Sequence, residues 1–600
     1  MTAGLVEEAQ DASGRQGAEA RRPGRIFRAA LVAAAPHLSY LLLAVAVTGR
    51  LWVHRDIRLV AANPTDHQQF LWFLGNTAYA LAHGENPLLT DRLNVPGQAN
   101  LMANTSILGL GIPLSPITLL VGSTATFIVA LILTLAGTAS SWYWLLSRHV
   151  VPSRLAAYVG AGFCGFGPGM IAQAGGHPNL TAQFLVPLIV WRVIALRNGG
   201  HAVRNGIILG LLITYQAFLN EEVLLLTAVA CALFLCAYAV QRWSEVRGQV
   251  RPFLAGMLVA ALTAGALLAY PLWVQFFGPG HYRGLPPGVD RFTTDLASYP
   301  AFARRTLAGS DAAARQVTMS ANEETFLGWP LLIFIVAAVV MLWRRPVVRA
   351  LAATGLAFAL LSLGPSITVH GHKTHIPGPL RVLRHIPPFE LATATRYALV
   401  VGPVVGVLLA IAIAALLNWA ARDRARQVLA VVAVGLALLP IAPKPLQVID
   451  KPVPRFILSG QWRQYVDGDH SLVSVPLPRN DQMQGMRWAG LANAGFRIPR
   501  GYFIGPRSAT DPRASYYPAL RPTSSLLAVV AQTGRVPKIT DADRAAARAD
   551  LRYWQAAVVV VAGRERHADA LVTTVTSLIG PGVWDEDGEV WRWDVRTLTE

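Results

Sequence analysis

The sequence predicts a polytopic α-helical membrane protein with a small α/β domain at its C-terminal end. Of its 600 residues, 53% are hydrophobic and 14% are charged, whereas soluble domains carry about 25% charged residues. About eleven apolar runs between residues 27 and 442 approach or reach the length that crosses a bilayer. Residues 455–600 contain no such run and instead show short strand and helix patterns.

The chain begins with a polar tail and a first apolar run. Residues 1–26 carry several arginines and few apolar side chains, which is typical of a disordered segment. The run 27–50 is long enough to span a bilayer. We therefore expect a retained first helix there, and not a cleaved signal peptide.

The other spans follow in order along the chain. They are expected at 123–146, 155–173, 180–197, 203–220, 223–240, 252–276, 328–343, 347–364, 396–419 and 427–442. The run 106–122 contains Pro113 and Pro116 together with glycines. Broken helices persist at membrane depth only where protein or water covers them. This run is therefore predicted to be a re-entrant or surface-lying segment.

Arginine placement predicts the orientation of the chain. Short arginine-bearing loops lie at 147–154, 197–204, 241–251, 344–349 and 421–426. Such loops are typical of the cytoplasmic side. The opposite loops are long or carry Asp, Glu and His, at 51–122, 175–179, 220–222, 277–327 and 365–395. The N-terminus is thus expected in the cytoplasm and, with an odd number of spans, the C-terminus outside.

The region after the last span is predicted to be an extracytoplasmic α/β domain, residues 443–600. Buried strands are expected at 470–478 and 556–563, an alternating strand at 589–595, and helices at 541–554 and 565–579. The predicted organisation is a disordered cytoplasmic tail (1–26), a transmembrane domain (27–442) with a first outer loop (51–122), and this domain (443–600).

Charge and cysteine usage exclude two other classes of function. The net charge of +18 would suggest nucleic acid as a partner of a soluble protein. Here the arginines lie between apolar runs, so membrane topology explains them and no nucleic-acid partner is expected. The three cysteines, Cys164, Cys231 and Cys236, all lie within apolar runs. Neither a disulfide framework nor a cysteine zinc site is predicted.

Asp66 is the first candidate catalytic residue. A carboxylate just outside a membrane helix can accept a proton from an acceptor hydroxyl as a general base. It can also cap the helix that the following amphipathic segment predicts, and the two roles are compatible. Asp91, later in the same loop, is a weaker candidate whose simplest interpretation is a solvated loop residue.

Further candidates lie at other predicted outer junctions. Glu221 and Glu222 are adjacent, so at most one of them points into a cavity, and a solvated turn is an equal alternative. His177 could hydrogen-bond a sugar or phosphate, or could serve only its turn. Arg396 begins a span, where a guanidinium can hold a lipid phosphate through paired N–H donors or extend to the interface.

The remaining polar clusters favour no particular chemistry. His370, His372 and His375 could bind a metal, but they lack a motif spacing, so no metal is predicted. Glu323 and Glu324 stand at the mouth of a predicted helix, with no function indicated. The sequence contains no phosphate-binding loop and no H-E-x-x-H motif.

Four stretches resemble the bacterial integral membrane branch of the GT-C superfamily of glycosyltransferases. They are "TDHQQFLWFLGNTAYALAHGENPLLTDRLNVPGQANL", "AQAGGHPNLTAQFLVPLIVW", "HIPPFELATATRYALVV" and "VSVPLPRND". The third departs from the pattern, because Thr393 or Ala394 stands where the first basic residue often occurs. The resemblance covers most of the chain through loose motifs.

The resemblance implies a GT-C-like fold and a membrane glycosyltransferase of the plasma (inner) membrane. GT-C enzymes take sugar from a polyprenyl-phosphate donor at the outer face, and an acid of the first outer loop, here Asp66, acts as base. Arg396 would face the donor phosphate, and Asp91, His177 and Glu222 would line the cavity. No cofactor or metal is implied. The expected partners are the lipid bilayer, the polyprenyl-phosphate-linked sugar, and an envelope glycan or glycolipid acceptor.

Two alternatives stay open. A transporter or lipid flippase would keep ionisable groups near the bilayer midplane, where these spans have almost none. A non-catalytic GT-C-like scaffold could bind an envelope glycan or an assembly partner through residues 455–600. Fold resemblance alone does not separate such a scaffold from an active enzyme.

Overall fold

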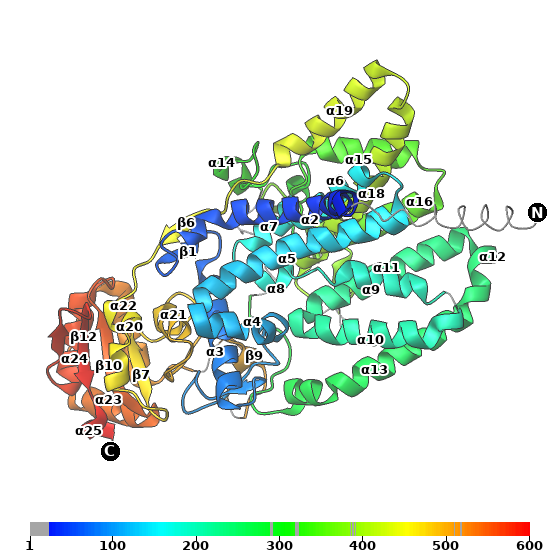
Figure 1. Ribbon diagram of the computed structural model, residues 1–600. Coiled ribbons are helices and arrows are strands. Elements are labelled where there is room, and N and C mark those ends of the chain that lie inside the picture. Colours follow the sequence, from blue (N-terminus) through cyan, green and yellow to red (C-terminus); the bar gives the residue numbers. More distant parts are fainter. Residues whose placement is uncertain are drawn as a thin grey trace, which may run out of the picture.

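The computed structural model describes most of the chain. The described residues are 23–197, 199–288, 292–317, 323–383, 386, 389, 392–508, 510–516 and 519–599. Most of the predicted N-terminal tail, residues 1–22, lies outside them. A long bundle of helices carries a smaller α/β domain at one end (Figure 1).

Helices occupy the region that the sequence predicts to cross the membrane. Within the described residues, nine helical segments are long and apolar enough to span a bilayer. They are Ala33–Trp52, Ser123–Val150, Arg154–Ala174, Pro178–Ala195, Ala202–Leu219, Glu221–Gln241, Trp243–Phe277, Ala394–Ala420 and Arg424–Ile441. Two shorter apolar helices, Trp329–Met341 and Pro346–Ser362, occupy the other predicted spans. The prediction of a polytopic helical membrane protein is confirmed.

The bundle has two distinct ends. Its helices are α2 (Pro23–Trp52), α3 (Pro64–His83), α4 (Leu108–Val121), α5 (Ser123–Leu145), α6 (Arg154–Phe166), α7 (Pro168–Ala174), α8 (Pro178–Thr181), α9 (Val186–Ala195), α10 (Ala202–Leu219), α11 (Glu221–Gln241), α12 (Trp243–Val246), α13 (Val250–Phe277), α14 (Asp311–Arg315), α15 (Trp329–Met341), α16 (Pro346–Ser362), α17 (Leu380–Leu383), α18 (Ala398–Ala420) and α19 (Arg424–Leu438). Helix α3 lies beside the α/β domain, whereas α12 lies at the far end (Figure 1). A π-helical turn, Leu146–Val150, continues α5.

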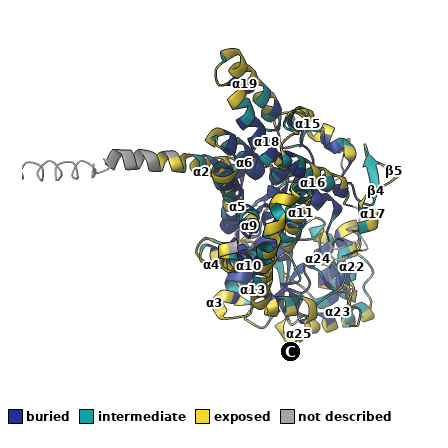
Figure 2. Ribbon diagram, turned by 90° about the vertical axis from the view of Figure 1, so that its right-hand side faces the viewer, coloured by how far each residue is buried: buried dark blue, intermediate teal, exposed yellow. Residues whose placement is uncertain are grey.

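Outer helices present apolar side chains to their surroundings. On α13, Leu254, Leu258 and Leu262 are 59%, 61% and 65% exposed. Their spacing of four residues places them on one face of the helix. Figure 2 shows exposed residues along the outer helices and buried ones in the interior of the bundle. This pattern suits a bundle surrounded by lipid, where outward apolar side chains carry no penalty.

The predicted re-entrant run forms a short continuous helix, α4, despite its two prolines. A proline leaves the carbonyl four residues earlier without its helical donor. For Pro113 that carbonyl belongs to Gly109, and the hydroxyl of Tyr215 on α10 donates to it at 2.8 Å. For Pro116 it belongs to Ile112, and the hydroxyl of Ser115 donates to it at 2.5 Å. Replacement donors therefore keep α4 helical.

A two-stranded sheet joins distant parts of the chain beside α3. Strand β1 (Arg58–Val60), after the first span, pairs antiparallel with β6 (Val448–Asp450), after the last. The chain therefore enters α3 and the α/β domain from the same place. Small hairpins lie at β2 (Leu89–Thr90) with β3 (Ala99–Asn100), β4 (Ser366–Val369) with β5 (His372–Pro377), and β8 (Gly505–Pro506) with β9 (Ala514–Ser515).

The C-terminal region contains a four-stranded mixed sheet in the order β11-β12-β10-β7. Its strands are β7 (Ser471–Val475), β10 (Ala556–Ala562), β11 (Val583–Asp585) and β12 (Val590–Asp594), and its helices are α20 (Arg455–Leu458), α21 (Gln484–Leu491), α22 (Pro522–Thr533), α23 (Asp541–Tyr553), α24 (Ala568–Ile579) and α25 (Arg596–Thr599). Strands β7 and β10 are buried throughout, as strands covered on both faces are. The predicted strands and helices are present here.

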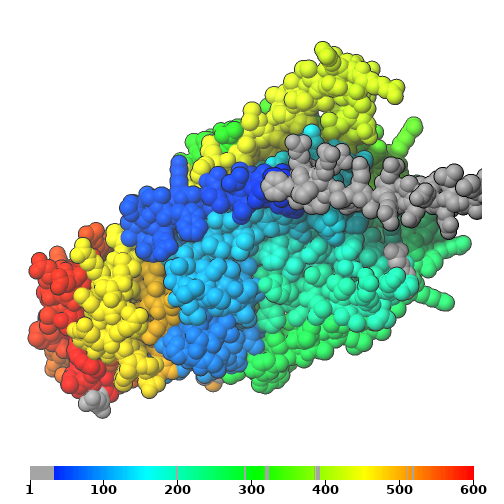
Figure 3. All heavy atoms as spheres, viewed as in Figure 1, coloured from blue at the N-terminus to red at the C-terminus, as the bar shows by residue number. Residues whose placement is uncertain are grey.

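Helix α3 is buried on nearly all sides because α21 of the α/β domain packs against it. A Cβ atom on Gly75 of α3 would lie 2.9 Å from the carbonyl oxygen of Gly490. A Cβ atom on Gly490 would lie 2.8 Å from the backbone nitrogen of Trp72. Only glycine at both positions lets the helices approach this closely. In the space-filling view of Figure 3, the α/β domain lies directly against the first part of the chain.

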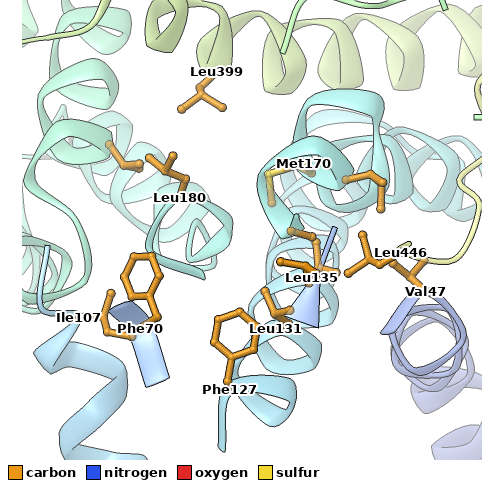
Figure 4. Packing of buried hydrophobic residues seen from close by; sticks show 14 of the residues in the cluster. Val47, Phe70, Ile107, Phe127, Leu131, Leu135, Met170, Leu180, Leu399 and Leu446 are labelled. Atoms are coloured by element: carbon orange, nitrogen blue, oxygen red, sulfur yellow. The ribbon is translucent and has the colours of Figure 1, made fainter. Parts of the chain in front are cut away.

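On its other side α3 is anchored to the bundle core. Phe70 of α3 and Phe127 and Leu131 of α5 belong to one buried cluster, which Figure 4 shows. Each of the three is at most 2% exposed, and burying such a side chain contributes about 1.5–3 kcal/mol. Helix α3 is therefore held between the bundle and the α/β domain.

Candidate active site

The first turn of α3 holds Asp66. Asn63 is the N-cap of this helix, since its side-chain oxygen accepts from the backbone N–H of Asp66 at 3.1 Å. Pro64 follows at the first helical position, where proline is favoured. The sequence-based interpretation of Asp66 as the cap is therefore wrong, because Asn63 and Pro64 begin the helix earlier. This leaves the Asp66 carboxylate available for other contacts.

His177 reaches Asp66 from the turn between α7 and α8. Its Nε2 atom lies 2.7 Å from Oδ2 of Asp66. Two glycines before it permit the approach. A Cβ on Gly175 would lie 2.8 Å from Cβ of Ala62, and one on Gly176, whose φ is +145°, would lie 2.9 Å from the Asn63 carbonyl oxygen.

The Asp66 carboxylate is held in its ionised form. Burial raises its pKa, but hydrogen bonds from His177 and Asn63 and the charge of Arg396 outweigh burial and lower the pKa below the ordinary value. Asn63 donates to Oδ2 at 2.7 Å, so both side-chain hydrogen bonds go to that oxygen. Among the described residues, Oδ1 accepts no hydrogen bond. A substrate hydroxyl can therefore bind at Oδ1.

Arg396 and Glu222 form a second pair near the first. Nη1 of Arg396 lies 3.0 Å from Oε2 of Glu222, and both side chains are about one-fifth exposed, at 20% and 22%. Glu222 stands in the first turn of α11, and Arg396 in the 3₁₀ turn Ala394–Tyr397 before α18. The charge of Arg396 acts on Asp66, so the two pairs share one site. Within the described residues, Nε of Arg396 is buried without a hydrogen-bond partner.

Glu324 is a site residue to which the sequence assigned no role. Its side chain is buried and accepts a hydrogen bond from the Gln173 amide of α7. Burial raises the pKa of Glu324 to about 7, against the opposing charge of Arg396 and with support from Glu222. Its neighbour Glu323 turns away and pairs with Arg304 at 2.9 Å. The two adjacent glutamates therefore have different partners. No local sequence pattern predicts which of them faces the site.

Asp91 does not join the other predicted residues. It forms an ion pair with Arg497 of the α/β domain. Its carboxylate therefore helps to hold the first loop against that domain, and it lies outside the group formed by Asp66, His177, Glu222 and Arg396.

The α/β domain adds an aromatic residue to the site. Tyr516 follows β9, and burial and the charge of Asp66 raise the pKa of its phenol, while the charge of Arg396 lowers it. Its ring stacks on Tyr502 with centroids 5.9 Å apart. Neither tyrosine is predicted from the sequence, because the turns that carry them follow no recognisable motif.

Metal ligands are not gathered in the part of the chain that the structure describes. Within it, no group of three or more His, Cys, Asp or Glu side chains could hold a metal ion. His372 and His375 lie on strand β5, and His370 lies in the turn before it.

A large apolar groove begins beside the Arg396–Glu222 pair. Its volume is about 1240 Å³. Val223 and Leu399, which follow Glu222 and Arg396 in the sequence, line it at one end, and Arg197 and Arg345 line it at the other. Most of its walls are apolar side chains of α9, α11, α16 and α18. The groove thus connects the charged site to the arginine-bearing end of the bundle.

Sequence comparison identifies one family, and structural comparison identifies a fold. Residues 36–442 match a family described as a domain of unknown function, DUF6311. No curated protein matches the sequence. Among solved structures, the cryo-EM structure of the arabinofuranosyltransferase AftD from Mycobacteria matches with a TM-score of 0.53 and 13% identity. The match covers 90% of this chain and 36% of that chain, so this chain spans about a third of the length of AftD.

Two structures of the oligosaccharyltransferase AglB from Archaeoglobus fulgidus match less well. One contains an inhibitory peptide and a dolichol-phosphate, and the other a tethered acceptor peptide. Each has a TM-score of 0.45 and 13% identity, and the match covers 93% of this chain and 74% of that chain. The likeness to AftD confirms the GT-C-like fold that the sequence resemblance implies.

Proposed function

This chain belongs to the DUF6311 family, and we propose that it is a membrane glycosyltransferase with Asp66 as its general base. The donor is a sugar on polyprenyl phosphate, and the acceptor is a glycan or glycolipid of the cell envelope. The observation that carries this proposal is the geometry of the Asp66 carboxylate: His177 and Asn63 both bind Oδ2, and Oδ1 accepts no hydrogen bond among the described residues. The arabinofuranosyltransferase with the same fold supports glycosyl transfer as the reaction class.

Proton transfer to Asp66 accompanies bond formation. The acceptor hydroxyl hydrogen-bonds to Oδ1 of Asp66, and its oxygen attacks the anomeric carbon of the donor sugar. As that bond forms, the hydroxyl proton passes to Asp66, and the bond from the anomeric carbon to the phosphate oxygen breaks. The electron pair leaves with the polyprenyl phosphate. His177 and Asn63 keep the carboxylate oriented through Oδ2, as general base catalysis requires.

Arg396 binds the donor phosphate in this scheme. Its Nε atom has no partner among the described residues, and Nη1 is shared with Glu222. A guanidinium can therefore offer further N–H donors to phosphate oxygens, in the forked geometry that suits them. The negative charge that develops on the departing phosphate strengthens this contact, so Arg396 stabilises the transition state in addition to binding the donor.

The apolar groove accommodates the lipid part of the donor. Its lining includes Val223, next to Glu222, and Leu399, three residues after Arg396, close to the proposed phosphate position. A polyprenyl chain placed there keeps its isoprene units in apolar surroundings, as they are in the bilayer. The phosphate then stays at the charged end of the groove. The arginine-bearing turns at the far end favour the cytoplasm, which supports the outer face as the side of this reaction.

The test is transfer by the full-length protein in lipid nanodiscs, supplied with a panel of radiolabelled polyprenyl-phosphate sugars and membrane extracts as acceptors. We expect one donor to label an acceptor, and Asp66→Asn to reduce labelling at least about 100-fold. Asp91→Asn is the matched control, because Asp91 is an acid of the same loop that lies outside the site, and it should retain activity. Absence of transfer from every donor would overturn the proposal and favour a non-catalytic scaffold.

A further inference from the structure

The α/β domain contacts the part of α3 that carries Asp66 through two hydrogen bonds. The hydroxyl of Thr65 donates to the Asn480 carbonyl oxygen at 3.2 Å. The amide of Gln69 donates to the Tyr502 carbonyl oxygen at 2.9 Å. Residues three or four apart share a helix face, so Tyr502 lies on the face of α3 where Asp66 stands.

Tyr502 and Tyr516 form a fixed aromatic pair at this position. Their rings lie 5.9 Å apart with an interplanar angle of 21°. Pairing of β8 with β9 holds the chain just before Tyr516, and the backbone N–H of Ala514 donates to the Arg283 carbonyl oxygen at 2.9 Å. Both tyrosines are half-buried, so each residue remains partly accessible to solvent.

The tyrosine pair lies near the two charged groups proposed to react with or bind the substrates, Asp66 and Arg396. The charges of Asp66 and Arg396 both act on the Tyr516 phenol. A molecule that contacts the Tyr516 ring is therefore close to the carboxylate that takes the proton. The donor phosphate, by contrast, is expected at Arg396 and the groove. The tyrosine pair is therefore on the Asp66 side of the site, where the proposed function puts the acceptor hydroxyl.

We propose that Tyr502 and Tyr516 form the binding subsite for a sugar ring of the acceptor, which makes the acceptor a carbohydrate. This inference rests on the proposed glycosyl transfer and specifies the acceptor's chemistry. A sugar ring has an apolar C–H face that packs on an aromatic ring, and hydroxyls that bond to nearby polar groups. Tyrosine suits both, because it is rigid, flat and carries a polar tip.

Carbohydrate fits this position better than a lipid chain. The pair is bordered by the polar side chain of Gln69 and by the charged groups of the site. A lipid chain there would remove water from the charged groups of the site without replacing its hydrogen bonds, which is unfavourable. A sugar can replace the lost water with its hydroxyls.

The test measures carbohydrate binding without donor, so it does not depend on turnover. Full-length protein in lipid nanodiscs is titrated with neutral oligosaccharides of arabinofuranose, mannose, galactose and glucose, with saturation-transfer NMR as the readout. We expect at least one oligosaccharide to bind, Tyr516→Leu and Tyr502→Leu to weaken it about tenfold, and Tyr516→Phe to bind nearly as well as wild type. Leucine keeps apolar bulk and removes the aromatic face.

Tyr553→Leu is the control. Tyr553 is an exposed tyrosine of the same domain on α23, and its ring contacts Arg521 and neither tyrosine of the pair. Equal affinity of wild type and both leucine variants, or no binding by any oligosaccharide of the panel, would overturn the inference. Tyrosine-dependent binding without any transfer would support the subsite and refute the enzyme. Transfer that depends on Asp66 but is unchanged in Tyr502→Leu and Tyr516→Leu would support the enzyme and refute the subsite. Melting curves of each variant identify any that fail to fold, and Tyr516→Phe against Tyr516→Leu then decides.

Discussion

His177 lies 2.7 Å from Asp66 through its Nε2 atom, although 111 residues separate the two in the sequence. The contact joins the turn after the first span to the turn between α7 and α8. It depends on the glycines at 175 and 176, because a side chain at either would meet Ala62 or Asn63. It also accounts for much of the ionisation of Asp66, since burial alone would raise the pKa of this carboxyl.

Removal of His177 should therefore change the pH dependence of transfer. Asp66 accepts a proton only when ionised, so its contribution to activity disappears as the pH falls through its pKa. In the wild type that pKa is lowered. In His177→Ala burial becomes the main influence and raises it, so the acid limb of kcat/KM moves to higher pH. The exposed His370 provides a control variant, His370→Ala, whose profile should match that of the wild type. An unshifted acid limb in His177→Ala would contradict this account of Asp66.

Glu324 predicts a pH-dependent stability. Its pKa is raised from 4.5 to about 7, so the folded chain holds this proton more tightly than the unfolded chain does. Stability is therefore lost as the pH rises from about 4.5 to about 7, where the unfolded group ionises first. Glu324→Gln does not ionise, so its Tm relative to the wild type should rise across this interval and level off above it. A Tm difference that stays constant from pH 4.5 to pH 8 would show that the side chain is not buried as described.

Arg396 should affect the donor more than the acceptor. Arg396→Lys keeps the charge but loses the forked donors, so we expect the KM for the polyprenyl-phosphate sugar to rise about tenfold, the equivalent of roughly 1.4 kcal/mol. The KM for the acceptor should stay within about twofold of the wild-type value. Arg381→Lys, at an exposed arginine of α17, is the control and should leave both constants unchanged. A change confined to the KM for the acceptor would contradict the assignment of Arg396 to the donor phosphate.

The close approach of α3 and α21 predicts a steric effect on stability. Gly75→Ala places a Cβ 2.9 Å from the Gly490 carbonyl oxygen, so the helices must separate, and we expect a loss of about 1–3 kcal/mol. Gly265→Ala on α13 is the matched control, because no atom lies within 4 Å of its added Cβ. Thermal unfolding in nanodiscs compares the two. Equal melting temperatures would mean that the α/β domain does not pack on α3 in this way.

The fold was predictable because its signal is local. Apolar runs such as 123–146 report membrane helices directly, and strand patterns such as 556–563 report the C-terminal sheet. Helix α4 was harder to predict, since its two prolines suggest a break. Its continuity depends on a hydroxyl from Tyr215 on another helix, and no pattern within 106–122 contains that information.

The site was predictable only in part. The sequence places Asp66, His177, Glu222 and Arg396 at turns on one side of the membrane, and the structure brings them together. The sequence does not specify which side chains pair with one another, because pairing depends on the positions of the helices. Asp91 was therefore expected in the cavity, although it pairs with Arg497 of the α/β domain.

Residues supplied by distant segments were beyond the reach of the sequence patterns. Glu324 becomes a site residue because α7 delivers Gln173 to it. The tyrosines at 502 and 516 reach the site because the α/β domain packs against α3. Each of these contacts depends on tertiary packing. The segments that carry Glu324 and the two tyrosines contain no motif that predicts them.

The most direct test separates donor binding from chemistry in one variant. Donor affinity and the rate of the first turnover are measured for wild type and Asp66→Asn, with the donor bound in advance and the acceptor added by rapid mixing. Because Asp66 is the proposed base, we expect Asp66→Asn to bind the donor with a Kd within about threefold of the wild-type value. Its transfer rate should be at least about 100-fold slower. A transfer rate close to that of the wild type would contradict the assignment of Asp66 as the general base.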